Sequence, residues 1–222
     1  MNVIELRRYV MKPGRRDDLI DLFEREFLES QENCGMLPLG HYRDMDDDNS
    51  FVWFRAFSGV ESRKRALEAF YLESPAWLEN RNAANDTMVD SDNVLLLRPA
   101  RPESGFDVSG LRRPPVSANG QSAASSFVAV SIDVLPSAAS EEYIARFENG
   151  VLPRLRAIAD RCAYFVTEES PNTFPRLPVR EGEFCFVAAG VCENLAALDA
   201  WRSEFPAGEV LRLLPARRSL LR

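Results

Sequence analysis

Residues 3–23, VIELRRYVMKPGRRDDLIDLF, pass from an alternating strand pattern through a Pro-Gly turn into a helical pattern. Two sets of side chains alternate along the strand, an apolar set and a polar set: Ile4, Leu6 and Val10, and Glu5, Arg7 and Tyr9. Since successive strand residues point to opposite faces of a sheet, each set shares one face. The stretch therefore predicts a strand with one apolar and one polar face, followed by a helix.

The rest of the first hundred residues extends this pattern. Apolar residues three and four positions apart predict an amphipathic helix over about 15–30. Two strands at 39–45 and 50–57 are separated by the polar turn DDDN and are typical of a hairpin. A helix through VESRKRALEAFYLES, interrupted before Pro75 and continued by a short helical piece, precedes a last strand, DNVLLLRP. The predicted order is β-α-β-β-α-β, as in a ferredoxin-like unit.

The second half resembles the first more loosely. Residues 101–125 are rich in Pro, Gly and Ser, which predicts a linker or surface crossover between domains at 1–100 and 126–222. Beyond it, FVAVSIDVL aligns with the opening strand, and EFCFVAAGVCENLAALDAW aligns with SFVWFRAFSGVESRKRALEAF. The first alignment replaces the polar set by smaller side chains: Ala129, Ser131 and Asp133. We therefore expect a tandem repeat with a degenerate second unit, and any site in the first unit.

Composition excludes several functions. The net charge of -7 argues against binding to nucleic acids or anionic membranes. Neither a signal-peptide pattern nor an apolar run of membrane-spanning length occurs, so we expect a cytoplasmic protein. The four cysteines are widely spaced and predict free thiols. The basic clusters Arg15-Arg16 and Arg63-Lys64-Arg65, and the final pair Arg217-Arg218, predict solvated surface.

Three segments in order, ELRRYVMKPG, FVWFRAFSGVESRKRALEAFY and PAW followed by AANDTMVDSDNVLLLRP, resemble the NIPSNAP family within the dimeric α/β-barrel superfamily. The resemblance implies an α+β fold of two tandem ferredoxin-like βαββαβ units, whose antiparallel sheets pair face to face around a cleft. The second sheet would come from the C-terminal half or from another subunit, and we expect a homodimer. The superfamily includes cofactor-independent monooxygenases, decarboxylases, isomerases and haem-degrading proteins, so the resemblance leaves the reaction open.

Three residues are candidate catalytic groups: Glu5, Arg7 and His41. If the polar face of the first strand lines the barrel interior, Arg7 would bind an anionic or carbonyl oxygen while Glu5 or Tyr9 transfers a proton. The alternative is a structural Glu-Arg pair capped by the tyrosine. His41, the sole histidine, is a candidate acid or base near neutral pH, or a plain hydrogen-bonded side chain.

Five residues are candidate substrate-binding groups: Tyr9, Arg43, Trp53, Arg55 and Phe57. Trp53, Arg55 and Phe57 share one face of their strand. An arginine within an aromatic row predicts either a pocket wall suited to a planar anionic ligand, or packing at a sheet rim. The strand register that would bring Arg55 to Arg7 is not set by the sequence.

The remaining motifs narrow the function. The glycines form no dinucleotide, P-loop or serine-hydrolase motif, and a single histidine predicts no metal site. We expect no cofactor. The leading hypothesis is a cofactor-independent enzyme acting on an aromatic or carbonyl-bearing molecule in the barrel cleft. The alternative is a non-catalytic module that binds a small hydrophobic or anionic ligand or acts as a scaffold.

Overall fold

The computed structural model describes residues 1–116 and 126–222. The N-terminal half comprises β1 (Val3–Met11), α1 (Arg16–Leu22), the π-helical turn η1 (Phe23–Phe27), α2 (Leu28–Asn33), β2 (Leu37–Asp44), β3 (Ser50–Phe57), α3 (Val60–Glu68), the π-helical turn η2 (Ala69–Glu73), α4 (Pro75–Asn85) and β4 (Met88–Pro99). The C-terminal half comprises β5 (Phe127–Leu135), α5 (Glu141–Gly150), α6 (Leu152–Arg156), β6 (Asp160–Thr167), β7 (Phe184–Cys192), α7 (Leu195–Ser203) and β8 (Glu209–Pro215). Each half thus has the predicted order of strands and helices.

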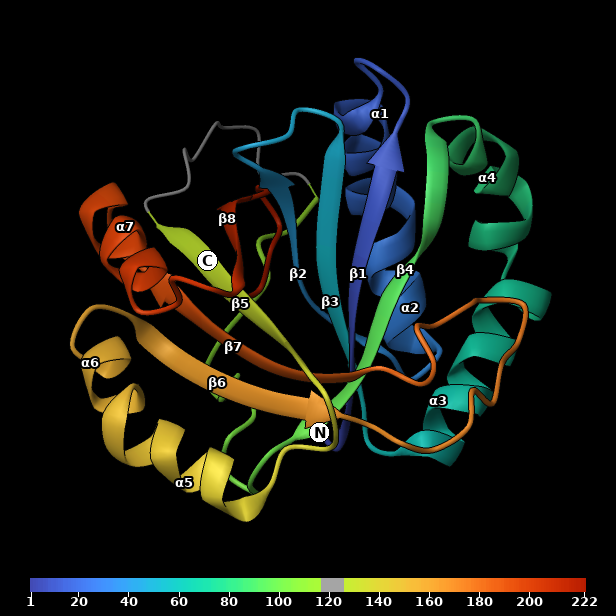
Figure 1. Ribbon diagram of the computed structural model, residues 1–222. Helices are drawn as coiled ribbons and strands as arrows, with labels where there is room; N and C mark the ends of the chain where they lie inside the picture. Colours follow the sequence, from blue (N-terminus) through green and yellow to red (C-terminus); the bar gives the residue numbers. More distant parts are fainter. Residues whose placement is uncertain (117–125) are drawn as a thin grey trace.

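The eight strands form one closed antiparallel barrel in the order β1-β3-β2-β8-β5-β7-β6-β4. The two halves meet twice, where β2 pairs with β8 and β4 pairs with β6. The second sheet therefore comes from the same chain, and no other subunit is needed to close the barrel. Helices α1–α4 cover the outside of the N-terminal sheet, and α5–α7 cover the outside of the C-terminal sheet (Figure 1).

The two faces of β1 have opposite surroundings. Ile4 and Leu6 point into the barrel and belong to a buried apolar cluster with residues of both sheets, such as Val130 and Val187. The polar set points the other way, towards the helices, where Tyr9 packs in a second cluster. The expectation that the polar face lines a cleft inside the barrel is therefore wrong. The interior is filled because the apolar faces of the two sheets bury each other.

The segment expected to be a linker is partly packed. Phe106, with Val108 and Leu111, lies against the barrel core. Its ring centroid is 5.8 Å from that of Phe54 and 5.5 Å from that of Phe165. Residues 101–116 thus cover an end of the barrel, while 117–125 lie outside the described residues. The division at 1–100 and 126–222 stays a prediction.

The N-terminal helix and the cysteines agree with the sequence pattern. The helix expected over 15–30 is present as α1, η1 and α2 in succession. All four cysteines are free. Among the helices of the described segments, none has the length and apolar character required to cross a membrane.

Candidate functional site

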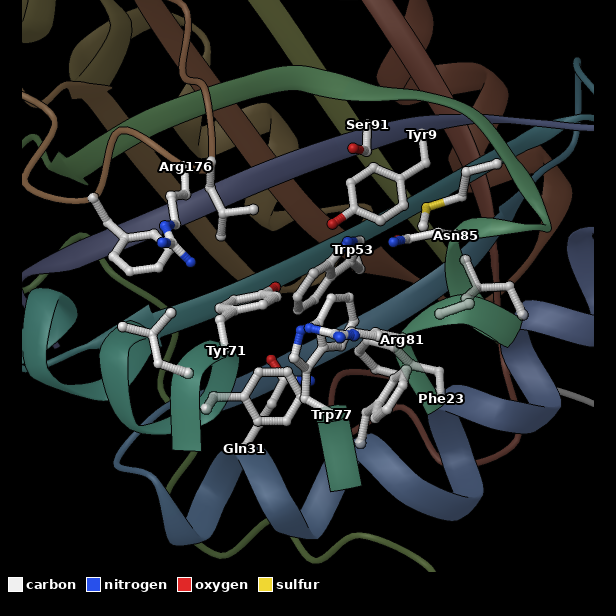
Figure 2. A pocket seen from close by; sticks show the side chains of 18 residues that line it. Tyr9, Phe23, Gln31, Trp53, Tyr71, Trp77, Arg81, Asn85, Ser91 and Arg176 are labelled. Carbon is white, nitrogen blue, oxygen red and sulfur yellow. The ribbon is translucent and has the colours of Figure 1, made fainter. Parts of the chain in front are cut away.

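A cavity of about 370 Å³ lies between the outer face of the N-terminal sheet and its helices. Its walls are mostly aromatic and aliphatic, and Figure 2 shows the hydroxyls of Tyr9 and Tyr71 on either side of Trp53. The lining residues are Tyr9, Leu19, Phe23, Phe27, Gln31, Trp53, Phe70, Tyr71, Leu72, Trp77, Arg81, Ala84, Asn85, Met88, Ser91, Phe174, Arg176 and Leu177. A concave space lined by many aromatic and aliphatic side chains, with polar groups among them, is typical of a small-molecule site.

Four charged side chains are buried together behind this wall. Glu5, which is fully buried, accepts hydrogen bonds from Arg7 at 2.8 Å, Arg55 at 2.7 Å and Arg63 at 2.5 Å. We call these four residues the Glu5 cluster. β1 and β3 bring Glu5 opposite Arg55, and α3 supplies Arg63 from above the sheet. One carboxylate among three guanidinium groups gives a buried net charge of +2.

The Glu5 cluster contacts the cavity wall directly. Arg7 donates a hydrogen bond to the Tyr9 hydroxyl at 2.9 Å, and Arg55 donates one to the Tyr71 hydroxyl at 3.2 Å. The Arg55 guanidinium also lies 5.0 Å from the ring centroid of Trp53. The guanidinium groups of Arg7 and Arg55 therefore lie directly behind the aromatic side chains of the wall, where the low dielectric strengthens their electric field.

The protonation states of Glu5 and Tyr9 follow from these contacts. Burial raises the pKa of Glu5, but the charges of Arg55, Arg7 and Arg63 lower it more, and it lies well below its usual range. Glu5 is therefore a stable carboxylate and a poor proton acceptor at neutral pH. Burial raises the pKa of Tyr9 more than Arg7 lowers it, so this phenol keeps its proton. Tyr9 can then donate a hydrogen bond into the cavity.

Several buried polar atoms at this site have no hydrogen-bond partner within the described residues. They are the Nη2 atoms of Arg55 and Arg63, the Nε1 atom of Trp53 and the Oε1 atom of Gln31. Trp53 and Gln31 line the cavity itself. Since buried polar groups are nearly always paired in folded proteins, unpaired ones at a cavity wall favour contact with a ligand or ordered water.

The structure brings most of the predicted site residues together. Tyr9 and Trp53 line the cavity, and Glu5, Arg7 and Arg55 lie behind it. Phe57 is buried beside Arg55, whose guanidinium is 5.6 Å from its ring centroid. The residues that the patterns of β1 and β3 singled out thus lie on the same outer face of the sheet.

His41 and Arg43 lie elsewhere. His41 is fully buried, with its Nε2 atom 3.0 Å from Glu24 and its backbone hydrogen-bonded to the Ser219 side chain. Burial lowers its pKa more than the bond to Glu24 raises it. Arg43 bonds Asp17 at the surface. Neither residue lines the cavity.

Sequence reasoning missed other parts of the site. Arg63, expected on a solvated face, is fully buried, although its neighbours Lys64 and Arg65 are exposed. Outside the site, Arg218, also expected at the surface, is buried and paired with Glu29. Helical periodicity could have placed Arg63 beside the buried Ala66 and Leu67.

The helical aromatics and a C-terminal segment also escaped prediction. Tyr71 and Trp77 line the cavity from the two sides of the η2–α4 boundary. Phe174, Arg176 and Leu177 come from the connection between β6 and β7, about a hundred residues away in sequence. No local pattern predicts that this connection reaches the N-terminal half.

Comparison with known proteins finds a family similarity in the N-terminal half. The NIPSNAP family profile matches residues 4–102. No curated protein matches the chain. A NIPSNAP family protein of Agrobacterium tumefaciens strain C58 is 24% identical over 45% of this chain and 89% of its own length, with a TM-score of 0.41.

Two solved structures cover nearly the whole chain, each named as a "putative monooxygenase". The one from Lactobacillus acidophilus NCFM covers 97% of this chain and 94% of its own length, at 10% identity and a TM-score of 0.57. The one from Fusobacterium nucleatum subsp. nucleatum covers 96% and 91%, at 8% identity and a TM-score of 0.57. Likeness at such identity shows the fold alone. Within that fold, the NIPSNAP profile match is confined to the N-terminal half, residues 4–102.

Proposed function

We propose that this protein binds a small planar molecule in the aromatic cavity and that the Tyr9 hydroxyl donates a hydrogen bond to a carbonyl or phenolic oxygen of that molecule. One observation carries the proposal. The Tyr9 hydroxyl accepts its bond from Arg7 and, among the described residues, donates none. A protonated donor in an aromatic cavity, supported by a buried cation, fits an oxygen on an otherwise apolar ligand.

The walls favour a flat ligand. Tyr71 and Trp77 pack edge to face, with ring centroids 4.8 Å apart, and Phe27 lies 5.6 Å from Trp77. Aromatic rings stack on such surfaces and gain from burial of their apolar area. The Trp53 indole N–H, which is unpaired in the described residues, supplies a second donor next to Tyr9.

Calorimetric titration with 2-naphthol and 2-acetylnaphthalene, a phenol and a ketone of similar size, tests this function. We expect both to bind, and Tyr9→Phe to weaken binding about five- to tenfold because one hydrogen bond is lost. The matched control is Tyr143→Phe in the C-terminal half, whose hydroxyl bonds Asp133. If neither compound binds, or if Tyr9→Phe binds both as the unmodified protein does, the proposal is wrong and a scaffolding role is favoured.

Catalysis is a second candidate, favoured by the net charge of +2 in the Glu5 cluster. Preorganised positive charge stabilises an enolate or phenolate more than the neutral ligand. An absorbance titration of bound 2-naphthol should therefore show a lower apparent pKa than in water, and Arg7→Met should reverse part of that shift. An unchanged pKa on binding would leave binding without activation. The similarity to the two compared structures does not identify a reaction for this protein, because it extends only to the fold.

The homodimer and the cytoplasmic location stay predictions. Because the barrel closes within one chain, a dimer would form through other surfaces. Size-exclusion chromatography with light scattering tests it, and a strict monomer would contradict it.

A further inference from the structure

The connection between β6 and β7, residues 168–183, extends from the C-terminal half to the cavity of the N-terminal half. In Figure 1 it is the orange segment that runs beside α3. Phe174, Arg176 and Leu177 of this connection line the cavity, and the Phe174 ring centroid is 6.0 Å from that of Tyr71. One wall of the site thus belongs to the half that has no matching polar cluster.

This connection is anchored to the Glu5 cluster. The Nη1 atom of Arg63 donates to the Asn172 side chain at 3.1 Å and to the Thr173 hydroxyl at 3.4 Å. Asn172 in turn donates to the backbone carbonyl of Leu177 at 2.9 Å and accepts from the backbone N–H of Phe174 at 3.1 Å. These bonds fix the turn that carries Arg176.

The charges on the cavity wall all have one sign. Arg81 of α4 and Arg176 are the charged residues among the described lining, which contains no carboxylate. Both side chains are exposed, and neither forms a hydrogen bond or an ion pair with a described residue. Exposed arginines elsewhere are of both kinds: Arg154 pairs with Glu204 at 2.6 Å, whereas Arg65 and Arg202 have no side-chain partner among the described residues. Arg81 and Arg176 differ from these in lining the same cavity. In a chain of net charge -7, two unpaired arginines at one cavity stand out.

We propose that the ligand is an aromatic acid, whose carboxylate meets Arg81 and Arg176 at the cavity mouth while its carbonyl or phenolic oxygen reaches Tyr9. This inference rests on the proposed function and adds the substrate class. Guanidinium groups bind carboxylates through charge-assisted hydrogen bonds. The two arginines come from different halves of the chain, so the C-terminal half contributes to specificity through Arg176.

The test uses 6-hydroxy-2-naphthoate and its primary amide, two planar compounds of nearly the same shape that differ in charge. Calorimetry should show the acid binding about five- to tenfold more tightly than the amide, with the preference falling as salt is added. Arg81→Ala and Arg176→Ala should each weaken binding of the acid more than binding of the amide, and so reduce the preference. Arg154→Ala, an exposed arginine away from the cavity, is the matched control and should keep the full preference.

The outcomes separate the two proposals. If acid and amide bind equally and Tyr9→Phe weakens both, the aromatic-acid inference is wrong and the proposed function stands. If the acid is preferred but both arginine variants keep the preference, the assigned residues are wrong and the inference falls. If neither compound binds, the aromatic-acid inference is overturned, and the titrations with 2-naphthol and 2-acetylnaphthalene decide the proposed function separately.

Discussion

The outer faces of the two sheets have the same architecture but contrasting contents. Under its helices the N-terminal sheet carries the Glu5 cluster and an open cavity. The C-terminal sheet carries Ala129, Ser131 and Ala188, and the Trp201 side chain of α7 packs on them. Trp201 donates a hydrogen bond to Ser131 at 2.7 Å, which satisfies the indole. One face is thus filled by an apolar cluster that includes Trp201, whereas the other keeps space and charge.

This difference indicates where function lies. Burying three guanidinium groups around one carboxylate costs desolvation free energy, and apolar residues of similar volume often stabilise a fold as well or better. The C-terminal face shows that this fold can close its outer layer without a cluster of buried arginines. The Glu5 cluster is therefore best explained by the cavity beside it, and stability experiments can sharpen the contrast.

The largest effect is expected from Glu5→Gln. Removing the carboxylate leaves Arg7, Arg55 and Arg63 buried without their common counter-charge, so the free energy of unfolding should fall by about 3–5 kcal/mol. Urea unfolding followed by circular dichroism measures it. The exposed Glu142→Gln, whose partner Arg146 is also exposed, should change it by less than about 0.5 kcal/mol. Equal unfolding midpoints for Glu5→Gln and the unmodified protein would contradict a stabilising role of the carboxylate.

The acid dependence of stability should differ between Glu5→Gln and the unmodified protein. The pKa of Glu5 is depressed in the folded state, so the unfolded chain takes up this proton first as the pH falls through about 4.5. Stability from Glu5 is complete above that range and is lost below it, with a slope approaching about 1.4 kcal/mol per pH unit. Glu5→Gln should lack this part of the slope between about pH 5 and 3. Parallel stability curves would show that Glu5 has an ordinary pKa.

A smaller effect is expected on the filled face. A Cβ atom at Gly190 would lie 2.6 Å from the Trp201 side chain, so Gly190→Ala should lower the free energy of unfolding by about 1–3 kcal/mol. Gly150→Ala, where a Cβ meets nothing within 4 Å, is the control and should leave stability unchanged or slightly higher. If Gly190→Ala is as stable as the unmodified protein, the C-terminal face is less tightly filled than its contacts indicate.

The sequence predicted the similarity of the two halves but not the register in which they align. The strand register places Glu5 opposite Arg55 but Ala129 opposite Gly190. The alignment of the later segments instead matches Arg55 with Ala188, two residues away. The two sequence alignments differ by two residues and therefore cannot both hold. A shift of two residues keeps each side chain on the same face and leaves the apolar pattern intact, so the pattern does not distinguish the two registers. In either register no arginine matches Arg7 or Arg55, because Ala129, Ser131 and Ala188 are uncharged and the one charged residue, Asp133, accepts a hydrogen bond from Tyr143.

The sequence by itself determined the strands, the helices and the division of β1 into two faces, because these depend on local periodicity. It also singled out Glu5, Arg7, Tyr9, Trp53 and Arg55 as unusual for strand positions. Only the tertiary structure decided which face lies inside the barrel, since that depends on the apolar area that the second sheet offers to Ile4 and Leu6. It also decided that Arg63 and the connection carrying Arg176 reach the site, while His41 does not. Those contacts join residues far apart in the chain, and no local pattern encodes the closure that brings them together.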